Sequence, residues 1–208
     1  MTTATTSLKR RAHDLSSTEA QLKVLGNGIF APGGLPTFAE RLAAEGLPEL
    51  RAGAPGILQV NVGYMCNQVC KHCHVDAGPD RKEIMHRETM AHCVDAVKAG
   101  GFHTVDITGG APEMNPDFRW FVEALRSAGA QDIIVRSNLT IFSANKKYHD
   151  LPHFFREQGV HVVSSLPFYT ADRTDRQRGE GVFERSIAAL QQLNALGTDG
   201  AHHLTVLA

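Results

Sequence analysis

Residues 64–74 read Tyr64-Met65-Cys66-Asn67-Gln68-Val69-Cys70-Lys71-His72-Cys73-His74 and carry three of the four cysteines of the chain. Three residues separate the first pair of cysteines, and two separate the second pair. Thiolates this close together in one loop are typical ligands of an iron–sulfur cluster. Three protein ligands on a four-iron cube leave one iron open, and an open position distinguishes a reactive metal site from a structural one. The spacing therefore predicts a [4Fe–4S] cluster on Cys66, Cys70 and Cys73.

A structural zinc loop is the alternative, with His72 or His74 as the fourth ligand, because three cysteines and one histidine are a common zinc set. Zinc sites normally pair two short motifs that lie far apart in the sequence. The remaining cysteine, Cys93, stands alone. The motif therefore favours iron–sulfur over zinc.

Composition bounds the class of protein. The chain has 208 residues, of which 42% are hydrophobic, enough for one sizeable domain with a core. A net charge of −1 argues against nucleic acid or an acidic membrane as the main partner. No run of apolar residues is long enough to span a membrane, and the polar start of the chain lacks a signal-peptide core. Clustered free thiols suit a reducing, cytoplasmic location.

The chain divides into a leader, residues 1–56, and a core domain, residues 57–208. In the leader, Thr37-Phe38-Ala39-Glu40 forms a capping box that predicts a short helix ending at Gly46. In the core, strands alternate with helices. The predicted strands cover residues 57–62, 104–108, 133–135, 160–166 and 204–207, and the predicted helices lie near residues 87–99, 116–129, 150–159 and 183–197. The mixed-charge run 172–178 is interpreted as a solvated loop.

This βα alternation predicts an α/β fold, a partial (β/α)6-type barrel of parallel strands. In such folds the ligand site lies at the carboxyl ends of the strands. The cysteine loop follows the first predicted strand, and Gly109-Gly110 follows the second. Ser137-Asn138 and Ser165 end the next two strands. All four polar or glycine-rich segments should therefore meet at one edge of the sheet.

The cysteine spacing resembles the signature of the radical S-adenosylmethionine (SAM) superfamily. That resemblance implies that SAM chelates the open iron and is cleaved to methionine and a 5′-deoxyadenosyl radical. The electron would come from a donor such as flavodoxin or ferredoxin. The superfamily usually has an aromatic residue just before the third cysteine, where this chain has His72.

The segment Gly109-Gly110-Ala111-Pro112-Glu113 resembles the superfamily's Gly-Gly-Glu-Pro motif, which contacts the SAM amino group. Alanine stands where glutamate is usual, and an ordinary βα turn is the alternative. Arg136 is a candidate partner of the SAM carboxylate. Asn138 and Ser165 are candidates for hydrogen bonds to the ribose hydroxyls. For these three residues a local loop hydrogen bond is an equal alternative.

Longer segments of the sequence narrow the resemblance to one family within the superfamily. They are residues 58–64, 73–79, 106–113, 138–141, 165–167, 175–179 and 181–184. Together they are similar to the arsenosugar-biosynthesis radical SAM protein family. The resemblance implies transfer of the deoxyadenosyl group of SAM to a small-molecule acceptor, a trivalent dimethylated arsenic species.

Members of that family continue beyond the end of this sequence, so the resemblance implies a barrel truncated near its fifth strand. We expect such an incomplete barrel to be poorly soluble and to form little product, because its last strand would expose an open edge. The rival interpretations are another radical SAM modification activity and a non-catalytic, truncated metal-binding relative.

Overall fold

The computed structural model describes residues 6–26, 36–197 and 204–207. By its internal contacts the chain divides into two units, one of residues 8–55 and one of the remaining residues. In the smaller unit, the helices are η1 (Asp14–Ser16), α1 (Thr18–Gly26) and α2 (Phe38–Ala44). The predicted capping box is confirmed, because Thr37 and Glu40 each bond the backbone N–H of the other. Helix α1 was not predicted.

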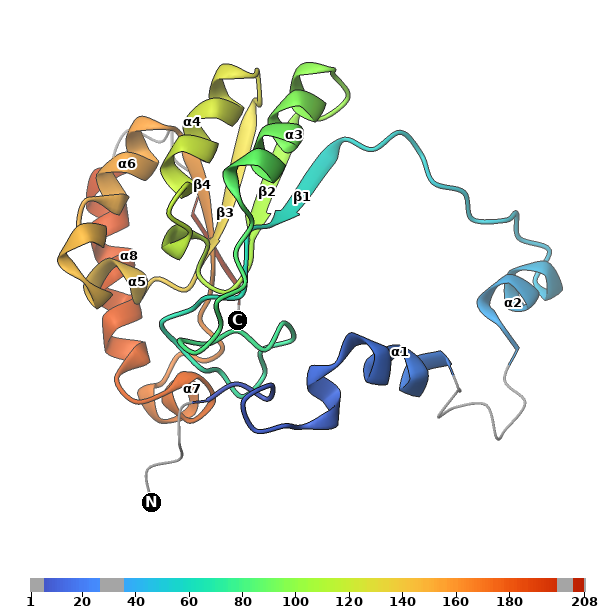
Figure 1. Cartoon of the computed structure of the whole chain (residues 1–208), viewed down its shortest axis with the longest axis horizontal. Coiled ribbons are helices and arrows are strands. Elements are labelled where there is room, and N and C mark those ends of the chain that lie inside the picture. The colour runs from blue at the N-terminus through green and yellow to red at the C-terminus, as the bar shows by residue number, and fades with distance from the viewer. Residues whose placement is uncertain (1–5, 27–35, 198–203, 208) are drawn as a thin grey trace. The chain divides into compact units, whose positions relative to one another are not determined.

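The larger unit alternates strands and helices (Figure 1). Its strands are β1 (Ile57–Asn61), β2 (Thr104–Thr108), β3 (Asp132–Ser137), β4 (Val160–Ser165) and β5 (Leu204–Leu207). Its helices are α3 (Arg87–Lys98), η3 (Pro112–Met114), α4 (Phe118–Ser127), α5 (Ile141–Ala144), η4 (Lys146–Tyr148), α6 (Leu151–Glu157), α7 (Ala171–Arg178) and α8 (Val182–Leu196). The five predicted strands are confirmed.

The strands form one parallel sheet in the order β1-β2-β3-β4-β5. Each strand pairs with the next one along the chain, so all carboxyl ends lie at the same edge. Within the described residues β1 and β5 do not pair, and the sheet is open. The predicted fold class, an α/β partial barrel of parallel strands, is therefore confirmed.

The hydrophobic core lies between the sheet and its helices. Val105, Ile107 and Ile133 are fully buried on the strands, because parallel strands covered by helices have little solvent contact. Phe118 of α4 and Phe155 of α6 belong to the same buried cluster, and their two rings pack edge to face with centroids 6.1 Å apart. Figure 1 shows α3 and α4 along one face of this sheet. This packing holds the strand ends in place.

The prediction of a solvated loop at residues 172–178 is wrong. They lie in helix α7, and its residues Thr174 and Arg178, one turn apart, are buried. A mixed-charge sequence without apolar residues gives no sign of a buried face, because that face consists of polar side chains with specific partners. No helix in the described parts of the chain is long and apolar enough to cross a membrane.

Candidate metal and S-adenosylmethionine site

A long connection between β1 and α3 carries the three clustered cysteines. Its two ends are tied together, because Met85 N donates to Val62 O at 2.9 Å and Tyr64 N donates to the carbonyl of Glu83 at 2.9 Å. Further along, Cys66 N donates to Gly78 O at 3.2 Å. The buried Asn115 donates its amide hydrogens to Val62 O and Met85 O, both at 2.9 Å. The loop is therefore braced by its own backbone and by the segment after η3.

The glycine pair after β2 packs directly against this loop. Gly110 N donates to Gly63 O, and Ala111 N donates to Met65 O, both at 2.9 Å. A Cβ on Gly109 would lie 2.6 Å from Gly63 O, and one on Gly110 would lie 2.5 Å from Met65 O. Both distances are shorter than van der Waals contact, so only glycine permits this approach. The glycines thus fix the cysteine loop as well as lining the pocket beside it.

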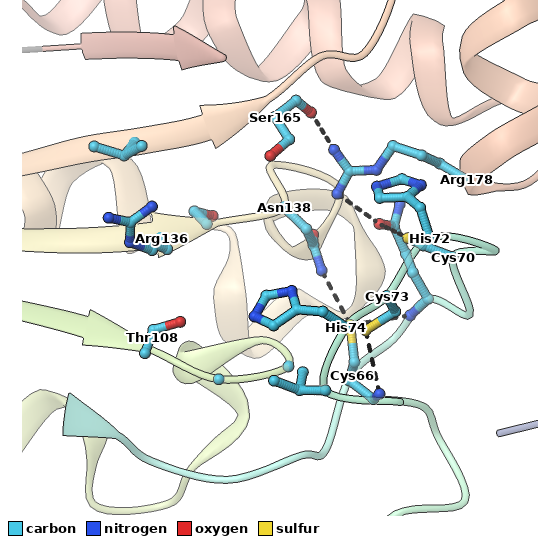
Figure 2. A pocket seen from close by; sticks show the side chains of 17 residues that line it. Cys66, Cys70, His72, Cys73, His74, Thr108, Arg136, Asn138, Ser165 and Arg178 are labelled. Carbon is cyan, nitrogen blue, oxygen red and sulfur yellow. Dashed lines mark hydrogen bonds between the residues drawn. The ribbon is translucent and has the colours of Figure 1, made fainter. Parts of the chain in front are cut away.

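The three cysteines line one pocket with the carboxyl ends of the strands (Figure 2). Of the sequence-predicted residues, the lining includes Cys66, Cys70, Cys73, Gly109, Gly110, Arg136, Asn138 and Ser165. Residues from four separate segments are therefore brought together, as the strand-end argument predicts. Ala111, Pro112 and Glu113 are buried and are not part of this lining.

Hydrogen-bond donors face two of the sulfurs. Gln68 N lies 3.4 Å from the Sγ of Cys66, and Ala77 N lies 3.3 Å from the Sγ of Cys73. The side-chain amide of Asn138 also donates to the Sγ of Cys66, at 3.5 Å. Hydrogen bonds to the sulfurs are one of the means by which a protein adjusts the potential of an iron–sulfur cluster. The donor set therefore suits a thiolate-ligated cluster.

Burial raises the pKa of two of the thiols, and different groups oppose the rise at each of them. It raises the pKa of Cys66 to about 11, against smaller opposing effects of the Gln68 backbone and Asn138. Burial also raises the pKa of Cys70, while the guanidinium of Arg178 opposes that rise. Ligation needs the thiolate, so binding of a metal must displace these protons.

The single-ion alternative would need His72 or His74 beside the three thiols. No group of three or more His, Cys, Asp or Glu side chains among the described residues is arranged to hold one metal ion. His72 and His74 line the pocket, and burial lowers the pKa of His72, with the charge of Arg178 as the next cause. The three thiols of Cys66, Cys70 and Cys73 line this same pocket.

Arg136 reaches the pocket from β3 and is already paired. Its Nε lies 2.9 Å from Oδ1 of Asp106, and its Nη2 lies 2.8 Å from Oδ2. Asp106 also accepts a bond from the amide of Gln59 at 2.8 Å. Although burial opposes them, bonds from Arg136 and Gln59 lower the pKa of the Asp106 carboxyl. A guanidinium has five N–H donors, so this pair does not use all of them.

Asn138 holds the cysteine loop rather than pointing a free amide into the pocket. Its Nδ2 donates to Oδ1 of Asn67 at 2.8 Å as well as to Cys66, and its Oδ1 accepts from Thr140 Oγ1 and Ile141 N. Both amide hydrogens therefore have partners. The sequence left open a ribose contact or a local loop hydrogen bond for Asn138. A ribose contact from this side chain would require breaking one of these bonds.

Glu113 is buried behind the glycine turn. Neither carboxylate oxygen has a hydrogen bond of normal geometry within the described residues. Burial raises the pKa of this carboxyl to about 7, and the nearby Ser137 hydroxyl opposes the rise only in part. Glu113 thus lies outside the lining of the pocket.

Gln68 and Arg178 are among the lining residues that sequence reasoning missed. Arg178 donates to the carbonyl of Ser165 and, at 3.3 Å, to Oε1 of Gln68 (Figure 2). The phrase at residues 175–179 contributed to the family resemblance, but no role was attached to it. Arg178 stands in a run of charged residues that resembles an exposed surface, so the sequence gives no sign that its side chain is buried.

Comparison with known proteins gives the family. The model of the Radical SAM superfamily matches residues 60–208. The chain is 30% identical over 145 residues to mycofactocin maturase MftC of Mycobacterium ulcerans, covering 69% of this chain and 38% of the relative. It is 22% identical over 141 residues to a probable GTP 3′,8-cyclase of Saccharolobus solfataricus, covering 67% of this chain and 44% of the relative. The chain thus spans less than half the length of these curated relatives.

A solved structure has the same fold. Streptococcus suis SuiB bound to S-adenosylmethionine superposes with a TM-score of 0.58 at 16% identity, covering 76% of this chain and 35% of SuiB. The family match covers most of the chain, including the end of β1, the cysteine loop and strands β2 to β5. The chain therefore belongs to the radical SAM superfamily, whose members are enzymes that use a [4Fe–4S] cluster and S-adenosylmethionine.

Proposed function

We propose that this chain is the cluster-binding core of a radical SAM enzyme in which Cys66, Cys70 and Cys73 ligate a [4Fe–4S] cluster. The observation that carries the proposal is the convergence of three thiols from one loop with the ends of β2, β3 and β4 around one pocket. Three protein ligands leave one iron for SAM. When bound, the cluster supplies the electron that cleaves SAM into methionine and a 5′-deoxyadenosyl radical.

The residues of this chain have distinct tasks in the proposal. The backbone of Gly109 and Gly110 binds the amino group of SAM, and Arg136, oriented by Asp106, binds its carboxylate. Ser165 contacts the ribose. Asn138 acts mainly through Cys66, since its amide is engaged there. Ala111, Pro112 and Glu113 hold the turn that supports these contacts and exclude water behind it.

The proposed acceptor is a trivalent dimethylated arsenic species, to which the deoxyadenosyl group is added. Support comes from the resemblance of the sequence to the arsenosugar-biosynthesis family, above all in the turn of residues 109–113 and the segment of residues 73–79. We propose flavodoxin or ferredoxin as the electron donor, because a cluster of low potential needs a donor of low potential. We propose the reducing cytoplasm as the location, because the cysteine ligands must stay free of disulfide bonds. Modification of a peptide or nucleotide is the second candidate, favoured by the 30% identity to mycofactocin maturase MftC.

The test is anaerobic reconstitution with iron and sulfide, followed by reduction and addition of SAM. We expect about four irons per chain, a SAM-dependent change in the electron paramagnetic resonance spectrum, and an adenosylated arsenic product from dimethylarsenite. Cys70→Ala should abolish all three results. Cys93→Ala is the matched control, because Cys93 lies on α3 and does not line the pocket.

The outcomes separate the parts of the proposal. Protein that holds stoichiometric zinc and takes up no iron would refute the cluster assignment. Release of 5′-deoxyadenosine without an adenosylated arsenic product would refute the arsenic acceptor and leave the radical SAM assignment in place. Normal SAM cleavage by Cys70→Ala would show that the ligands are wrongly assigned.

A further inference from the structure

Helix α7 contacts the cysteine loop at a point that the proposed chemistry does not use. Lys71 N donates to the carbonyl of Gln177 at 2.9 Å, which ties the loop backbone to the end of the helix. The next residue, Arg178, is buried, with 7% of its surface exposed. Burying a guanidinium costs folding free energy unless its charge has partners. The groups around Arg178 therefore indicate the role of its side chain.

The partners of Arg178 come from two other segments. Its Nη1 donates to the carbonyl of Ser165 at the end of β4, and its Nη2 donates to Oε1 of Gln68 in the cysteine loop at 3.3 Å. The same oxygen of Gln68 accepts from the Sγ of Cys70 at 3.7 Å. Gln68 and Arg178 are 110 residues apart in the sequence. One guanidinium thus joins helix α7, strand β4 and the cysteine loop.

No carboxylate forms an ion pair with this guanidinium among the described residues. Nε of Arg178 and Nε2 of Gln68 are buried and also lack hydrogen-bond partners among the described residues. Both residues line the pocket that holds the three thiols. A sulfur that ligates metal is a thiolate, and thiolates accept hydrogen bonds from such groups. The guanidinium without an ion pair and the two residues with unused donors therefore belong to the lining of the pocket in which negative charge would collect.

We propose that Arg178 is a positioning residue that clamps the cysteine loop through Gln68 and raises the reduction potential of the cluster by its positive charge beside Cys70. This inference rests on the proposed function. A positive charge close to a cluster favours the reduced state, because reduction adds an electron. Removal of the charge should therefore make the potential more negative, and removal of the bonds should loosen the loop.

The experiment compares Arg178→Gln, which loses the charge, with Arg178→Lys, which keeps the charge and loses the two-sided fork. Arg176→Gln is the matched control, since Arg176 lies exposed on the same helix. Three quantities are measured: the midpoint potential of the reconstituted protein, the rate of iron loss to a chelator, and hydrogen exchange of residues 66–74 in the metal-free protein.

We expect Arg178→Gln to have a more negative midpoint potential and to lose iron roughly 10- to 100-fold faster than wild type, the usual effect of removing an outer-shell partner. Its loop should exchange faster. Arg178→Lys should keep the wild-type potential and still lose iron faster, and Arg176→Gln should match wild type in all three measurements.

Equal potentials for wild type and Arg178→Gln, or equal shifts in Arg178→Gln and Arg178→Lys, would overturn the role of the charge. Unchanged iron loss and unchanged exchange in both variants would overturn the clamp. If Arg178→Gln does not fold, the iron loss of Arg178→Lys decides the clamp. If wild type takes up no iron, the proposed function fails, whereas the hydrogen exchange of the metal-free protein still tests the clamp.

Discussion

The buried carboxyl of Glu113 predicts how the stability of the chain depends on pH. Its carboxyl is buried without a hydrogen bond of normal geometry, and its pKa is raised from 4.5 to about 7. The folded chain therefore holds a proton that the unfolded chain releases as the pH rises above 4.5. Stability must fall with rising pH in the window between these two values, because there the folded state binds more protons.

The magnitude follows from the two pKa values. At about 1.36 kcal/mol per pKa unit, ionisation of the unfolded chain costs the folded state roughly 3 kcal/mol at high pH. About 2.5 kcal/mol of this is lost between pH 5 and pH 9. Glu113→Gln replaces the carboxyl with a neutral group of the same shape, so that this loss disappears. The variant should be close to wild type at pH 5 and more stable by about 2–3 kcal/mol at pH 9.

The assay is urea unfolding of metal-free protein under reducing conditions, followed by the fluorescence of Trp120, the single tryptophan. Titration of the cysteines affects both proteins alike and cancels in the difference. Glu123→Gln on the exposed side of α4 is the control and should show no such trend. A stability difference between Glu113→Gln and wild type that stays constant from pH 5 to pH 9 would refute the reasoning.

Two further predictions concern the bracing of the cysteine loop. Gly110→Ala should destabilise the chain by about 1–3 kcal/mol and weaken iron retention, because the new Cβ would lie 2.5 Å from Met65 O; Gly56→Ala, with open space around it, is the control for both urea unfolding and iron analysis. Asn138→Ala should cost about 1–3 kcal/mol in the same unfolding assay, because it leaves its buried polar partners unsatisfied. Wild-type stability of either variant would show that the loop does not depend on that contact.

Much of the fold could be predicted from the sequence because its signals are local. Apolar runs bounded by glycine and proline indicate the five strands and the helices α3, α4, α6 and α8, and the alternation of the two predicts a parallel sheet. Parallel strands place their carboxyl ends at one edge, which is why the sequence alone predicts Gly109, Asn138 and Ser165 near the cysteine loop. Helix α7 was missed because its buried positions are polar.

For the site, too, some features follow from the sequence and others only from the tertiary structure. The cysteine spacing by itself determined the number of thiols and their place in one loop, since neighbouring residues in a chain stay close in space. Only the tertiary structure decided that Arg178 bonds to Gln68 of the cysteine loop, that Asn138 bonds to Cys66, and that the glycine pair packs on the backbone of this loop. These contacts join residues that lie far apart in the sequence, so they form only when the packed sheet brings its strand ends together.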